Sequence, residues 1–571
     1  MARMKGKQIL MEMLKAEGTE YIFGNPGTME CPLEDALQDY PEIQYIVALQ
    51  EATALGMGDG YARATQRPAV VSIHVSVGIA NAISLLYDAY RGGTPLVVLA
   101  GQVDTHLLLH EALLWSDMAE MTKHYTKWSA EVIHTSELAA VLRRAFKVAK
   151  SPPTGPVFLS LPWNMMDEEV EAEIVPSSPG DYRIRPDLHA LGKAVELLSS
   201  SDSPMMLVGD RIAQSGGVDE AVSLAETLGV PVYSLDFSEV NFPTSHPLYQ
   251  GGLGVASPTR RTRNLLAEAD VILAIGCDVI CQHWHTPEPL LTAGDRVIHL
   301  DSSQWEIEKR FPVAVGLWAD PKTGMKELAE ALDASLSRTQ REKARERTAS
   351  MTESKAARRE AFRRRAEAAR ERVPIAPEVL TAELAKALPP NAIIADESIT
   401  VRSALAAAIP RDRPGDYFGA RGGGLGWGMP GPLGLKLAFP KRPVVAVVGD
   451  GSSMYTIQAL WTAARYNIPV TYVICNNRSY KIVKEGMARY LAGTERESEF
   501  VGLSFYEKPI DVARIAESFD LVGIKVERPE ELQPALEKAL GAGRTAVVDV
   551  HIEERLEIKA IQEEWLAWQK G

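Results

Sequence analysis

Short apolar runs alternate with longer amphipathic stretches along almost the whole chain. Apolar runs without polar alternation are typical of strands buried on both faces, and a repeated strand-helix order is typical of parallel sheets covered by helices. The pattern therefore predicts an α/β protein with three mostly parallel sheets, each with helices on both faces. The expected strands are YIVALQ, AVVSIHVS, TPLVVLAG and GPVFLSLP in the first set, PMMLVGD, VPVYSL, DVILAIG and RVIHLD in the second, and NAIIAD, PVVAVVGD, VTYVICNN and TAVVDVHI in the third.

Two polar segments separate these three sets. The first, EAEIVPSSPGDYRIRP, is typical of a linker because it is polar and contains prolines. The second begins at SLSRTQREKARER, and its interleaved acidic and basic residues predict a solvated helix rather than an arm that binds nucleic acid. We therefore expect an N-terminal domain at 1–172, a central domain at 187–335, a charged helical linker at 336–373, a C-terminal domain at 374–555 and a C-terminal tail helix at 556–571.

The composition agrees with several domains. At 571 residues and 62.4 kDa, the chain is too long for one hydrophobic core. A hydrophobic content of 46% with 24% charged residues is typical of a soluble globular protein. The net charge of -14 argues against a protein that binds nucleic acid through a basic surface.

The cysteines and the N-terminus indicate a cytoplasmic protein. Cys31, Cys277, Cys281 and Cys475 form neither a CxxC pair nor a zinc-binding spacing, which favours free thiols over disulfides. The N-terminal MARMKGKQILMEMLKAEG predicts an amphipathic helix rather than a signal peptide. No apolar run reaches the roughly 18 to 20 residues that a membrane helix needs, so we expect no membrane span.

A glycine-rich loop with one acidic residue follows a strand near the C-terminus. In PVVAVVGDGSSM, Gly449, Asp450, Gly451 and Ser452 come directly after the apolar run. Glycines there let backbone amides approach a phosphate, and a helix expected from about Met454 would point its N-terminus at the same place. A dinucleotide fingerprint would need glycine in place of Met454, and a P-loop would need GK[ST], which is missing.

A second strand, PVTYVICNN, ends in Asn476 and Asn477. In a right-handed βαβ unit the two strands are neighbours, so Asp450 and Asn477 would point toward the same place. A few protein oxygens beside a diphosphate are the usual way in which proteins hold Mg²⁺. The sequence therefore predicts a Mg²⁺-diphosphate site with Asp450 and Asn477 as ligands.

The motif GDGS, followed by NN after one helix and one strand, resembles the diphosphate and metal motif of thiamine diphosphate-dependent enzymes. The resemblance implies Mg²⁺, with Ca²⁺ or Mn²⁺ as substitutes, bound by Asp450, Asn477 and the main-chain carbonyl of Ser479. It further implies a cofactor site formed by Asn25, Pro26, Gly27, Glu51, Thr400, Gly423, Leu425, Gly449, Asp450, Gly451, Ser452, Asn477, Ser479 and Tyr480.

Two further residues match roles that this family assigns. A glutamate bonded to the pyrimidine ring of the cofactor promotes its reactive form, and Glu51, after the strand YIVALQ, matches it. A bulky apolar residue bends the cofactor, and Leu425 in RGGGLGWGMP matches that position, with Gly423 expected to contact the aminopyrimidine. A glutamate at a strand end is more often a helix-capping or surface acid, so the role of Glu51 rests on the motifs together.

Within the superfamily of benzoylformate decarboxylases, acetolactate synthases and pyruvate decarboxylases, the chain is most similar to the benzoylformate decarboxylases. The similar segments are FGNPGTMECPLEDAL, VALQEATALGMGDGYARAT, HVSVGIANA, HEALLW, GPVFLSLP, GGLGWGMP and GDGSSMYTIQALWTAARYNIP. The resemblance implies decarboxylation of a benzoylformate-like 2-oxo acid to an aldehyde and CO₂. It also implies a dimer or tetramer with each active site between the pyrimidine domain of one subunit and the diphosphate domain of another.

The resemblance assigns substrate contacts to His74, His283 and Thr28, with His285 as a competitor of His283. General acids such as imidazole are typically worth roughly 10²- to 10⁴-fold in rate, although a histidine at a strand end is more often a surface or core residue. The expected catalytic residues are Glu51, His74, His283 and Thr28, and the expected substrate pocket comprises Thr28, His74, Leu113, Leu114, Trp115, His283, His285, Ile482, Val483 and Gly486.

Several positions depart from the benzoylformate decarboxylase pattern. Thr28 stands in place of a serine, and Gly486 in place of a phenylalanine. Lys481 and Lys484 add positive charge that could contact an anionic substrate, although a solvated helix face is the ordinary interpretation. The alternatives are a carboligase or lyase of the same superfamily, similar to acetolactate synthase, 2-hydroxyacyl-CoA lyase or oxalyl-CoA decarboxylase, and a catalytically silent cofactor-binding paralogue. FAD is not expected, because no motif demands it.

Overall fold

The chain forms three six-stranded sheets, and the strand pairs within them all run parallel in the part of the chain that is described. The computed structural model describes residues 2–178, 183–235, 238–254, 259–279, 281, 284–285, 289–292 and 296–569. The predicted α/β fold with three parallel sheets is confirmed. Within these ranges, no helix combines the length and the apolar character that crossing a bilayer requires.

The N-terminal sheet has the strand order β3-β2-β4-β5-β7-β6. Successive residues of its strands face opposite cores: Val70 packs with α1 and α6, whereas Val71 packs with α3 and α4. A short antiparallel pair, β1 with β8, closes one side. The elements are β1 (Ala2–Lys5), α1 (Gly6–Ala16), β2 (Tyr21–Asn25), α2 (Cys31–Leu37), β3 (Gln44–Val47), α3 (Glu51–Thr65), β4 (Ala69–Ile73), α4 (Val75–Gly92), β5 (Leu96–Gln102), α5 (Met118–Thr122), β6 (Trp128–Glu131), α6 (Leu138–Lys150), β7 (Val157–Pro162) and β8 (Glu169–Ala172).

The central sheet has the order β11-β10-β9-β12-β13-β14. One of its faces packs on α7, α9 and α11, and the other face packs on α10. The elements are α7 (Leu188–Ser199), β9 (Pro204–Val208), α8 (Arg211–Ser215), α9 (Val218–Leu228), β10 (Val232–Ser234), β11 (Tyr249–Gly252), α10 (Arg260–Ala267), β12 (Val271–Ile275), β13 (Arg296–Asp301), β14 (Val315–Trp318) and α11 (Pro321–Ser335).

The C-terminal sheet has the order β16-β15-β17-β18-β20-β19, so β17 and β18 are neighbours as predicted. Helices α13, α14 and α20 cover one face, and α15, α17 and α19 cover the other. The elements are α12 (Arg338–Ala368), α13 (Pro377–Ala387), β15 (Ile393–Glu397), α14 (Arg402–Ala408), β16 (Tyr417–Gly419), α15 (Gly431–Ala438), β17 (Val444–Gly449), α16 (Asp450–Ser453), α17 (Ala459–Arg465), β18 (Thr471–Asn476), α18 (Lys481–Tyr490), α19 (Val512–Glu517), β19 (Val522–Val526), α20 (Leu532–Leu540), β20 (Ala546–His551) and α21 (Ile558–Gln569).

The expected helix near Met454 is wrong. The segment after β17 forms the four-residue helix α16, and α17 begins only at Ala459. The backbone turns between them because the Thr456 hydroxyl donates to the carbonyl of Gly426 (2.5 Å), which ties this segment to another loop.

Strand β2 was not among the expected strands although it lies inside the N-terminal sheet. Its sequence, YIFGN, contains a glycine, which in a sequence usually indicates a turn. The structure explains this glycine, because a Cβ on Gly24 would lie 2.0 Å from the hydroxyl of Tyr45. Neighbour packing across β2 and β3 therefore requires glycine at this position.

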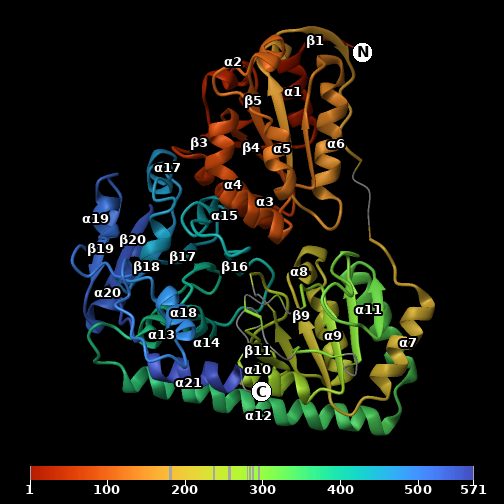
Figure 1. Cartoon of the computed structure of the whole chain (residues 1–571), viewed down its shortest axis with the longest axis vertical. Coiled ribbons are helices and arrows are strands. Elements are labelled where there is room, and N and C mark those ends of the chain that lie inside the picture. Colours follow the sequence, from red (N-terminus) through yellow and green to blue (C-terminus); the bar gives the residue numbers. More distant parts are fainter. Residues whose placement is uncertain are drawn as a thin grey trace.

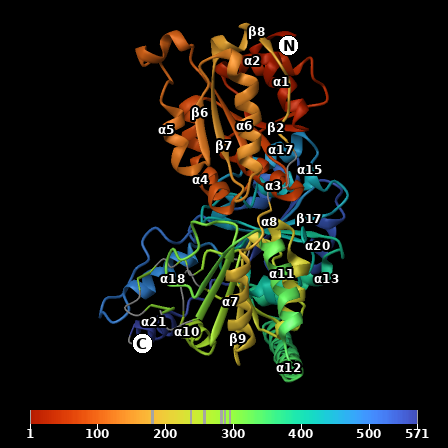
Figure 2. The same ribbon diagram turned by 90° about the vertical axis from the view of Figure 1, so that its right-hand side faces the viewer.

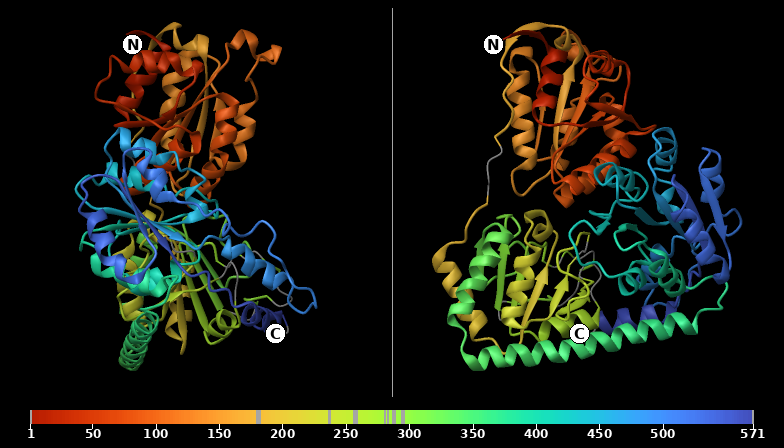
Figure 3. Two further views of the ribbon diagram at one scale, coloured as in Figure 1. Left: turned by 90° about the vertical axis from the view of Figure 1, so that its left-hand side faces the viewer. Right: turned by 180° about the vertical axis from the view of Figure 1, so that it is seen from behind.

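The N-terminal and C-terminal sheets share one hydrophobic core, and the long helix α12 runs along the base of the two lower sheets (Figures 1 and 3). Glycines allow α3 to approach α15, since a Cβ on Gly60 would lie 2.2 Å from the carbonyl oxygen of Gly431. The backbone N–H of Val47 at the end of β3 also donates to the Tyr466 hydroxyl after α17 (2.9 Å). The C-terminal helix α21 lies beside α18 and α10 (Figure 2).

Candidate active site

The residues expected at the cofactor site lie at the carboxyl edges of two sheets, where ligands of parallel sheets usually bind. In the N-terminal sheet, Asn25 ends β2, Glu51 follows β3 and His74 follows β4. In the C-terminal sheet, Asp450 follows β17 and Asn477 follows β18. The remaining expected cofactor residues lie at the same two edges: Pro26 and Gly27 after β2, Thr400 after β15, Gly423 and Leu425 after β16, Gly449, Gly451 and Ser452 at the end of β17, and Ser479 and Tyr480 after β18.

Glu51 is buried and held by one neighbouring side chain. The Asn81 amide donates to Glu51 Oε2 (2.9 Å), and only 6% of the residue is exposed. The helix α3 is capped instead by Gln50, whose side chain accepts from the backbone N–H of Thr53. Glu51 is therefore neither a capping residue nor a surface acid, and its carboxyl group is available for another role.

His74 is paired with a buried acid that sequence reasoning missed. Its Nδ1 lies 2.7 Å from Oε2 of Glu30, which also accepts from the backbone of Gly27 (3.0 Å), while Oε1 accepts from Gly101 (2.7 Å). Burial raises the pKa of Glu30, and the bond to His74 opposes that shift. The pairing fixes the ring and leaves Nε2 as the nitrogen that can meet a substrate. The signal was present in NPGTME, where an acid closely follows a motif glycine.

The other expected substrate residues differ in their surroundings. Thr28 is exposed at the start of a short turn of 3₁₀ helix, Thr28–Glu30, and Leu113 is 87% exposed. Leu114 and Trp115 are partly buried, and the Ser76 hydroxyl donates to the carbonyl of Leu114 (2.5 Å). His283 lies outside the described residues, and His285 is exposed.

Four residues around these edges have left-handed backbone conformations that side chains rarely adopt. They are Val75 (φ 35°), Leu114 (φ 70°), Ile399 (φ 40°) and Arg478 (φ 57°), and each is adjacent to or among the expected site residues. Such strain costs of order 1 to 3 kcal/mol per residue and is typically kept at functional sites. These four residues place strained backbone at both edges.

Asp450, Asn477 and Ser479 form a compact set of oxygen donors. The backbone N–H of Arg478 donates to Asp450 Oδ2 (2.9 Å), and that of Ser479 donates to Asn477 Oδ1 (3.0 Å). Burial is the main cause that raises the pKa of Asp450 to about 6, with the nearby Asp549 adding to it. A cation beside Asp450 would favour its ionised form, and hard oxygen donors fit Mg²⁺.

This donor set contains a single carboxylate. It therefore differs from the clusters of three or more His, Cys, Asp or Glu that hold many metals, and no such cluster occurs among the described residues. Mg²⁺ commonly takes only one or two protein carboxylates and completes its shell with phosphate and water. The residues present therefore fit a Mg²⁺-diphosphate group. A Cβ on Gly451 would lie 2.7 Å from the Tyr480 ring, so glycine keeps this loop closed against β18.

Helix α18 comes directly after the segment 477–480, which contains the expected metal ligands Asn477 and Ser479, and it carries part of the expected substrate pocket. Ile482 and Val483 are 46% and 47% exposed, and a Cβ on Gly486 would meet no atom within 4 Å. The interpretation of Lys484 as part of a solvated helix face is wrong. Lys484 is 3% exposed and its Nζ lies 2.6 Å from the carboxylate of Glu554, because α18 turns this side chain inward.

The two groups of residues make their hydrogen bonds within their own sheets. Glu51 bonds to Asn81, and His74 to Glu30, all in the N-terminal sheet region. Asp450 accepts from the segment after β18 in the C-terminal sheet region. The described chain thus contains two half-sites, one at each carboxyl edge.

Family models and known proteins resemble the chain over almost its whole length. Residues 4–121 match the thiamine pyrophosphate enzyme N-terminal TPP binding domain, residues 191–328 the central domain, and residues 399–550 the C-terminal TPP binding domain. A benzoylformate decarboxylase from Pseudomonas aeruginosa is 32% identical over 544 residues, which are 94% of this chain and 97% of that protein.

Two further relatives cover the chain to a similar extent. An acetolactate synthase large subunit from Haemophilus influenzae is 27% identical over 569 residues, 98% of this chain and 97% of that protein. The structure of a thiamine diphosphate-dependent 4-hydroxybenzoylformate decarboxylase from Rhodococcus jostii RHA1 matches with a TM-score of 0.83 and 27% identity, over 96% of this chain and 99% of that one. With all three family domains in order along three parallel sheets, the chain belongs to the thiamine pyrophosphate enzymes.

Proposed function

We propose that the chain is a thiamine diphosphate- and Mg²⁺-dependent decarboxylase that converts a benzoylformate-like 2-oxo acid into an aldehyde and CO₂. The observation that carries the proposal is the pairing of His74 with Glu30 at the sheet edge that also bears Glu51. It offers an oriented imidazole where a substrate would meet the cofactor. The similarity to a benzoylformate decarboxylase over 94% of the chain supports the same reaction.

The cofactor is anchored at the edge of the C-terminal sheet. Asp450, Asn477 and the carbonyl of Ser479 would hold Mg²⁺ beside the diphosphate. Ca²⁺ or Mn²⁺ would use the same oxygen donors. When bound, thiamine diphosphate supplies the carbon nucleophile and accepts the electrons released when CO₂ leaves. Glu51 bonds to the pyrimidine ring, and its buried, singly held carboxyl group supports that role.

The substrate meets residues of the N-terminal sheet edge. The Thr28 hydroxyl donates a hydrogen bond to the substrate carboxylate, and Nε2 of His74 faces the carbonyl oxygen of the substrate. Imidazole exchanges protons near neutral pH, so His74 can protonate that oxygen and, after regaining a proton from water, the carbon that lost CO₂. The bond between Nδ1 and Glu30 supports this role, because it orients the ring.

We propose that a complete site needs a second copy of the chain. The two half-sites lie on different sheets, and apolar side chains beside them are exposed: Leu49 (48%) near Glu51, Val77 (48%) near His74, and Tyr455 (53%) after α16. Exposed apolar patches on soluble proteins mark interaction or ligand-binding surfaces. A dimer or tetramer in which the N-terminal sheet edge of one subunit meets the C-terminal edge of another would cover them.

A carboligase is the second candidate, and the similarity to an acetolactate synthase large subunit favours it. The two reactions differ in whether a proton or a second carbonyl compound meets the carbon that lost CO₂. A general acid such as His74 favours the proton, since rapid protonation competes with ligation. The decarboxylase therefore remains the first candidate.

The experiment is to reconstitute the apoprotein with thiamine diphosphate and Mg²⁺ and to offer aromatic, branched and short 2-oxo acids. We expect CO₂ together with an aldehyde, and the highest kcat/KM with aromatic substrates. We expect His74→Ala to lower kcat by about 10²- to 10⁴-fold. His134→Ala, at an exposed position of the same domain, is the matched control and should keep wild-type turnover.

Acyloin or acetolactate as the main product would replace the decarboxylase with the carboligase. Full turnover of His74→Ala would remove the proposed proton transfer. Unchanged activity of Glu51→Gln would contradict the cofactor chemistry itself.

A further inference from the structure

The segment 420–428, which we call the Leu425 loop, is anchored on both sides of an exposed tip. Gly422 and Gly423 are exposed and Leu425 is half-buried, whereas Gly426 to Gly428 are buried. Leu425 and Gly423 are the residues proposed to contact and bend the cofactor. Their positions therefore depend on what holds the rest of the loop.

Buried carboxylates accept from the backbone on either side of Leu425. The N–H of Gly424 donates to Asp88 Oδ1 (2.9 Å), and that of Gly426 donates to Glu397 Oε1 (2.7 Å). The N–H of Gly428 donates to the second oxygen, Oε2, of Glu397. One side chain of β15 thus holds two amides of the loop, and one side chain of α4 holds a third.

The glycines of the loop make this approach possible. A Cβ on Gly424 would lie 2.6 Å from Asp88 Oδ2, and a Cβ on Gly428 would lie 2.6 Å from Glu397 Oε2. Any other residue at these positions would push the carboxylates away. The loop sequence is therefore matched to the two acids.

Neither Asp88 nor Glu397 takes part in an ion pair within the described part of the chain. Asp88 is 4% exposed and Glu397 is 0% exposed, and neither has a cation within salt-bridge distance among the described residues. Burial raises the pKa of Asp88 to about 7 and that of Glu397 to about 8. Burying a carboxyl group without a countercharge is costly, so these two positions cost stability that their contacts with the loop must offset.

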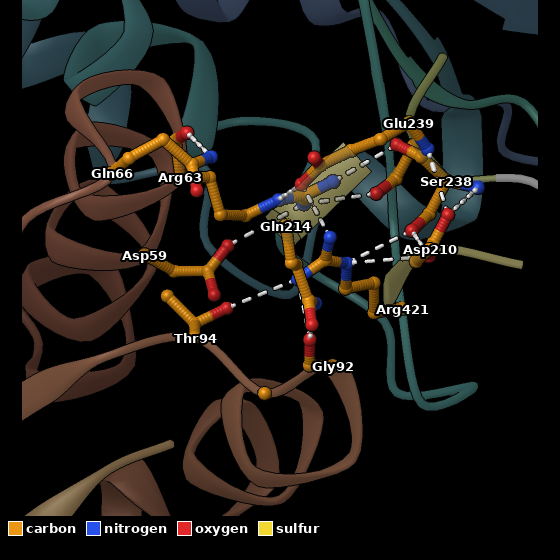
Figure 4. A network of polar contacts seen from close by, with 12 residues as sticks. Asp59, Arg63, Gln66, Gly92, Thr94, Asp210, Gln214, Ser238, Glu239 and Arg421 are labelled. Carbon is orange, nitrogen blue, oxygen red and sulfur yellow. Dashed lines mark hydrogen bonds and ion pairs between the residues drawn. The ribbon is translucent and has the colours of Figure 1, made fainter. Parts of the chain in front are cut away.

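Further contacts fix the flanks of the loop. The indole Nε1 of Trp427 donates to Asp59 on α3 (2.6 Å). At the other end, Arg421 pairs with Glu239 of the central domain and donates to the carbonyl of Gly92 (2.6 Å), as Figure 4 shows. The flanks are thus held by residues of the N-terminal and central domains, and the amides beside Leu425 are held by Asp88 and Glu397.

We infer that Glu397 is a positioning residue for the proposed reaction, which it serves by holding the Leu425 loop so that Leu425 and Gly423 meet the aminopyrimidine end of the cofactor. Asp88 assists from the opposite side of the tip. The inference rests on the proposed function, because Leu425 and Gly423 have these roles only if thiamine diphosphate is bound. Glu397 acts through two backbone amides and touches neither substrate nor cofactor.

The first test uses the apoprotein and needs no activity. Glu397→Gln keeps one acceptor, and Glu397→Met keeps the length of the side chain but removes both acceptors. We expect backbone hydrogen exchange in peptides covering 420–430 to become about 10-fold faster in Gln and faster still in Met, because buried amides lose their partners. Peptides from β17 and β18 should exchange as in the wild type.

The second test uses the protein reconstituted with thiamine diphosphate and Mg²⁺. We expect the exchange rate of the C2 proton of the bound cofactor and kcat to fall together by about 10- to 100-fold in Glu397→Gln, since small misplacements have such effects. The Kd for the cofactor and the substrate KM should stay near wild type, because the anchor at Asp450 and Asn477 is intact. A merely structural role would not produce this split.

Two matched variants separate positioning from general destabilisation. Asp88→Asn retains an acceptor for Gly424, and its amide can occupy the place of Oδ2, which has no partner among the described residues, so its effects should be smaller than those of Glu397→Gln. Asp301→Asn changes an equally buried carboxylate on β13 of the central sheet and should keep wild-type C2 exchange even if it lowers Tm.

Unchanged loop exchange in both Glu397 variants would overturn the inference, as would a loosened loop with wild-type C2 exchange. If Glu397→Met does not fold, Glu397→Gln decides alone. A wild-type protein that shows no C2 exchange with bound cofactor removes the proposed function and this role with it. If the wild type exchanges the C2 proton and the Glu397 variants exchange it at the same rate, the positioning role is removed and the proposed function stands.

Discussion

Gly78 has no side chain, and this leaves space for the carboxyl group of Glu51. A Cβ on Gly78 would lie 3.1 Å from Glu51 Oε1, which is tighter than side chains normally tolerate. On the other side, Asn81 holds Oε2 of the same carboxyl group. Both neighbours lie on α4, one turn apart, so this helix sets the direction of the carboxyl group by one close contact and one hydrogen bond.

Because of this arrangement, we expect a methyl group added at position 78 to affect stability and activity differently. Gly78→Ala should keep or raise Tm, because alanine favours a helix interior over glycine by about 0.8 to 1.0 kcal/mol. It should lower kcat by about 10- to 100-fold, since the added methyl group displaces the Glu51 carboxyl group. Gly192→Ala on α7 is the matched control, because its Cβ would meet no atom within 4 Å. Equal kcat in the two variants would contradict the proposed role of Glu51.

Helix α18 combines a buried anchor with an exposed apolar face. Lys484 pairs with Glu554, and Glu554 also accepts from the hydroxyl of Ser479 (2.5 Å), which follows β18. The opposite face exposes Ile482 and Val483 and leaves open space at Gly486. The contacts with Glu554 fix the helix beside the proposed cofactor site. The exposed face takes no part in these contacts, so its residues can differ according to the substrate.

The open space at Gly486 predicts a preference for substrates larger than benzoylformate. Gly486→Phe should lower kcat/KM for naphthyl or para-substituted 2-oxo acids by about 10-fold relative to benzoylformate. The phenyl ring would fill the space that the larger substrates occupy, and apolar contacts of this kind are worth about 1 to 3 kcal/mol. Gly486→Ala is the control and should change the ratio little. Equal changes for all substrates would show that this part of α18 does not line the substrate pocket.

The three domains meet in a buried ionic network, shown in Figure 4. Glu239 of the central domain lies 3.0 Å from Arg63 of α3 and also pairs with Arg421 after β16. Arg63 donates to the carbonyl of Ser238 (2.9 Å), and Asp210 lies beside Arg421. Glu239 thus pairs with one arginine from each of the other two domains, which joins the central domain to both.

Removing that acid should loosen the central domain. Glu239→Gln should destabilise the protein by about 3 to 5 kcal/mol, because it leaves two buried arginines with less countercharge. We expect calorimetry to show a lower first transition that separates from the main one. Glu342→Gln, in an exposed pair with Arg338 on α12, should change stability by less than about 0.5 kcal/mol. A single unshifted transition for Glu239→Gln would contradict the proposed joining role.

Much of the fold followed from the pattern of apolar residues. Strands such as Val444–Gly449 and Thr471–Asn476 are mostly apolar because both faces of their sheet are covered by helices, and runs of this kind can be recognised without a structure. The motif residues Asp450 and Asn477 were predicted to meet because adjacent parallel strands end at one edge, and β17 and β18 are adjacent.

Other features depended on contacts between distant parts of the chain. Strand β2, the burial of Lys484 and the pairing of Glu30 with His74 arise from neighbours that are far apart in sequence or on another element. The break between α16 and α17 likewise depends on a bond from Thr456 to the loop after β16. Local pattern carries no information about such partners.

By itself, then, the sequence determined the three parallel sheets and the edge residues that are proposed to hold a diphosphate and its metal, because strand period and motif spacing are local. Only the tertiary structure decided which acids hold the Leu425 loop and His74. Asp88, Glu397 and Glu30 look like ordinary acids in the sequence. Their roles follow from burial and from amides that other elements bring to them, and those are properties of the packed chain alone.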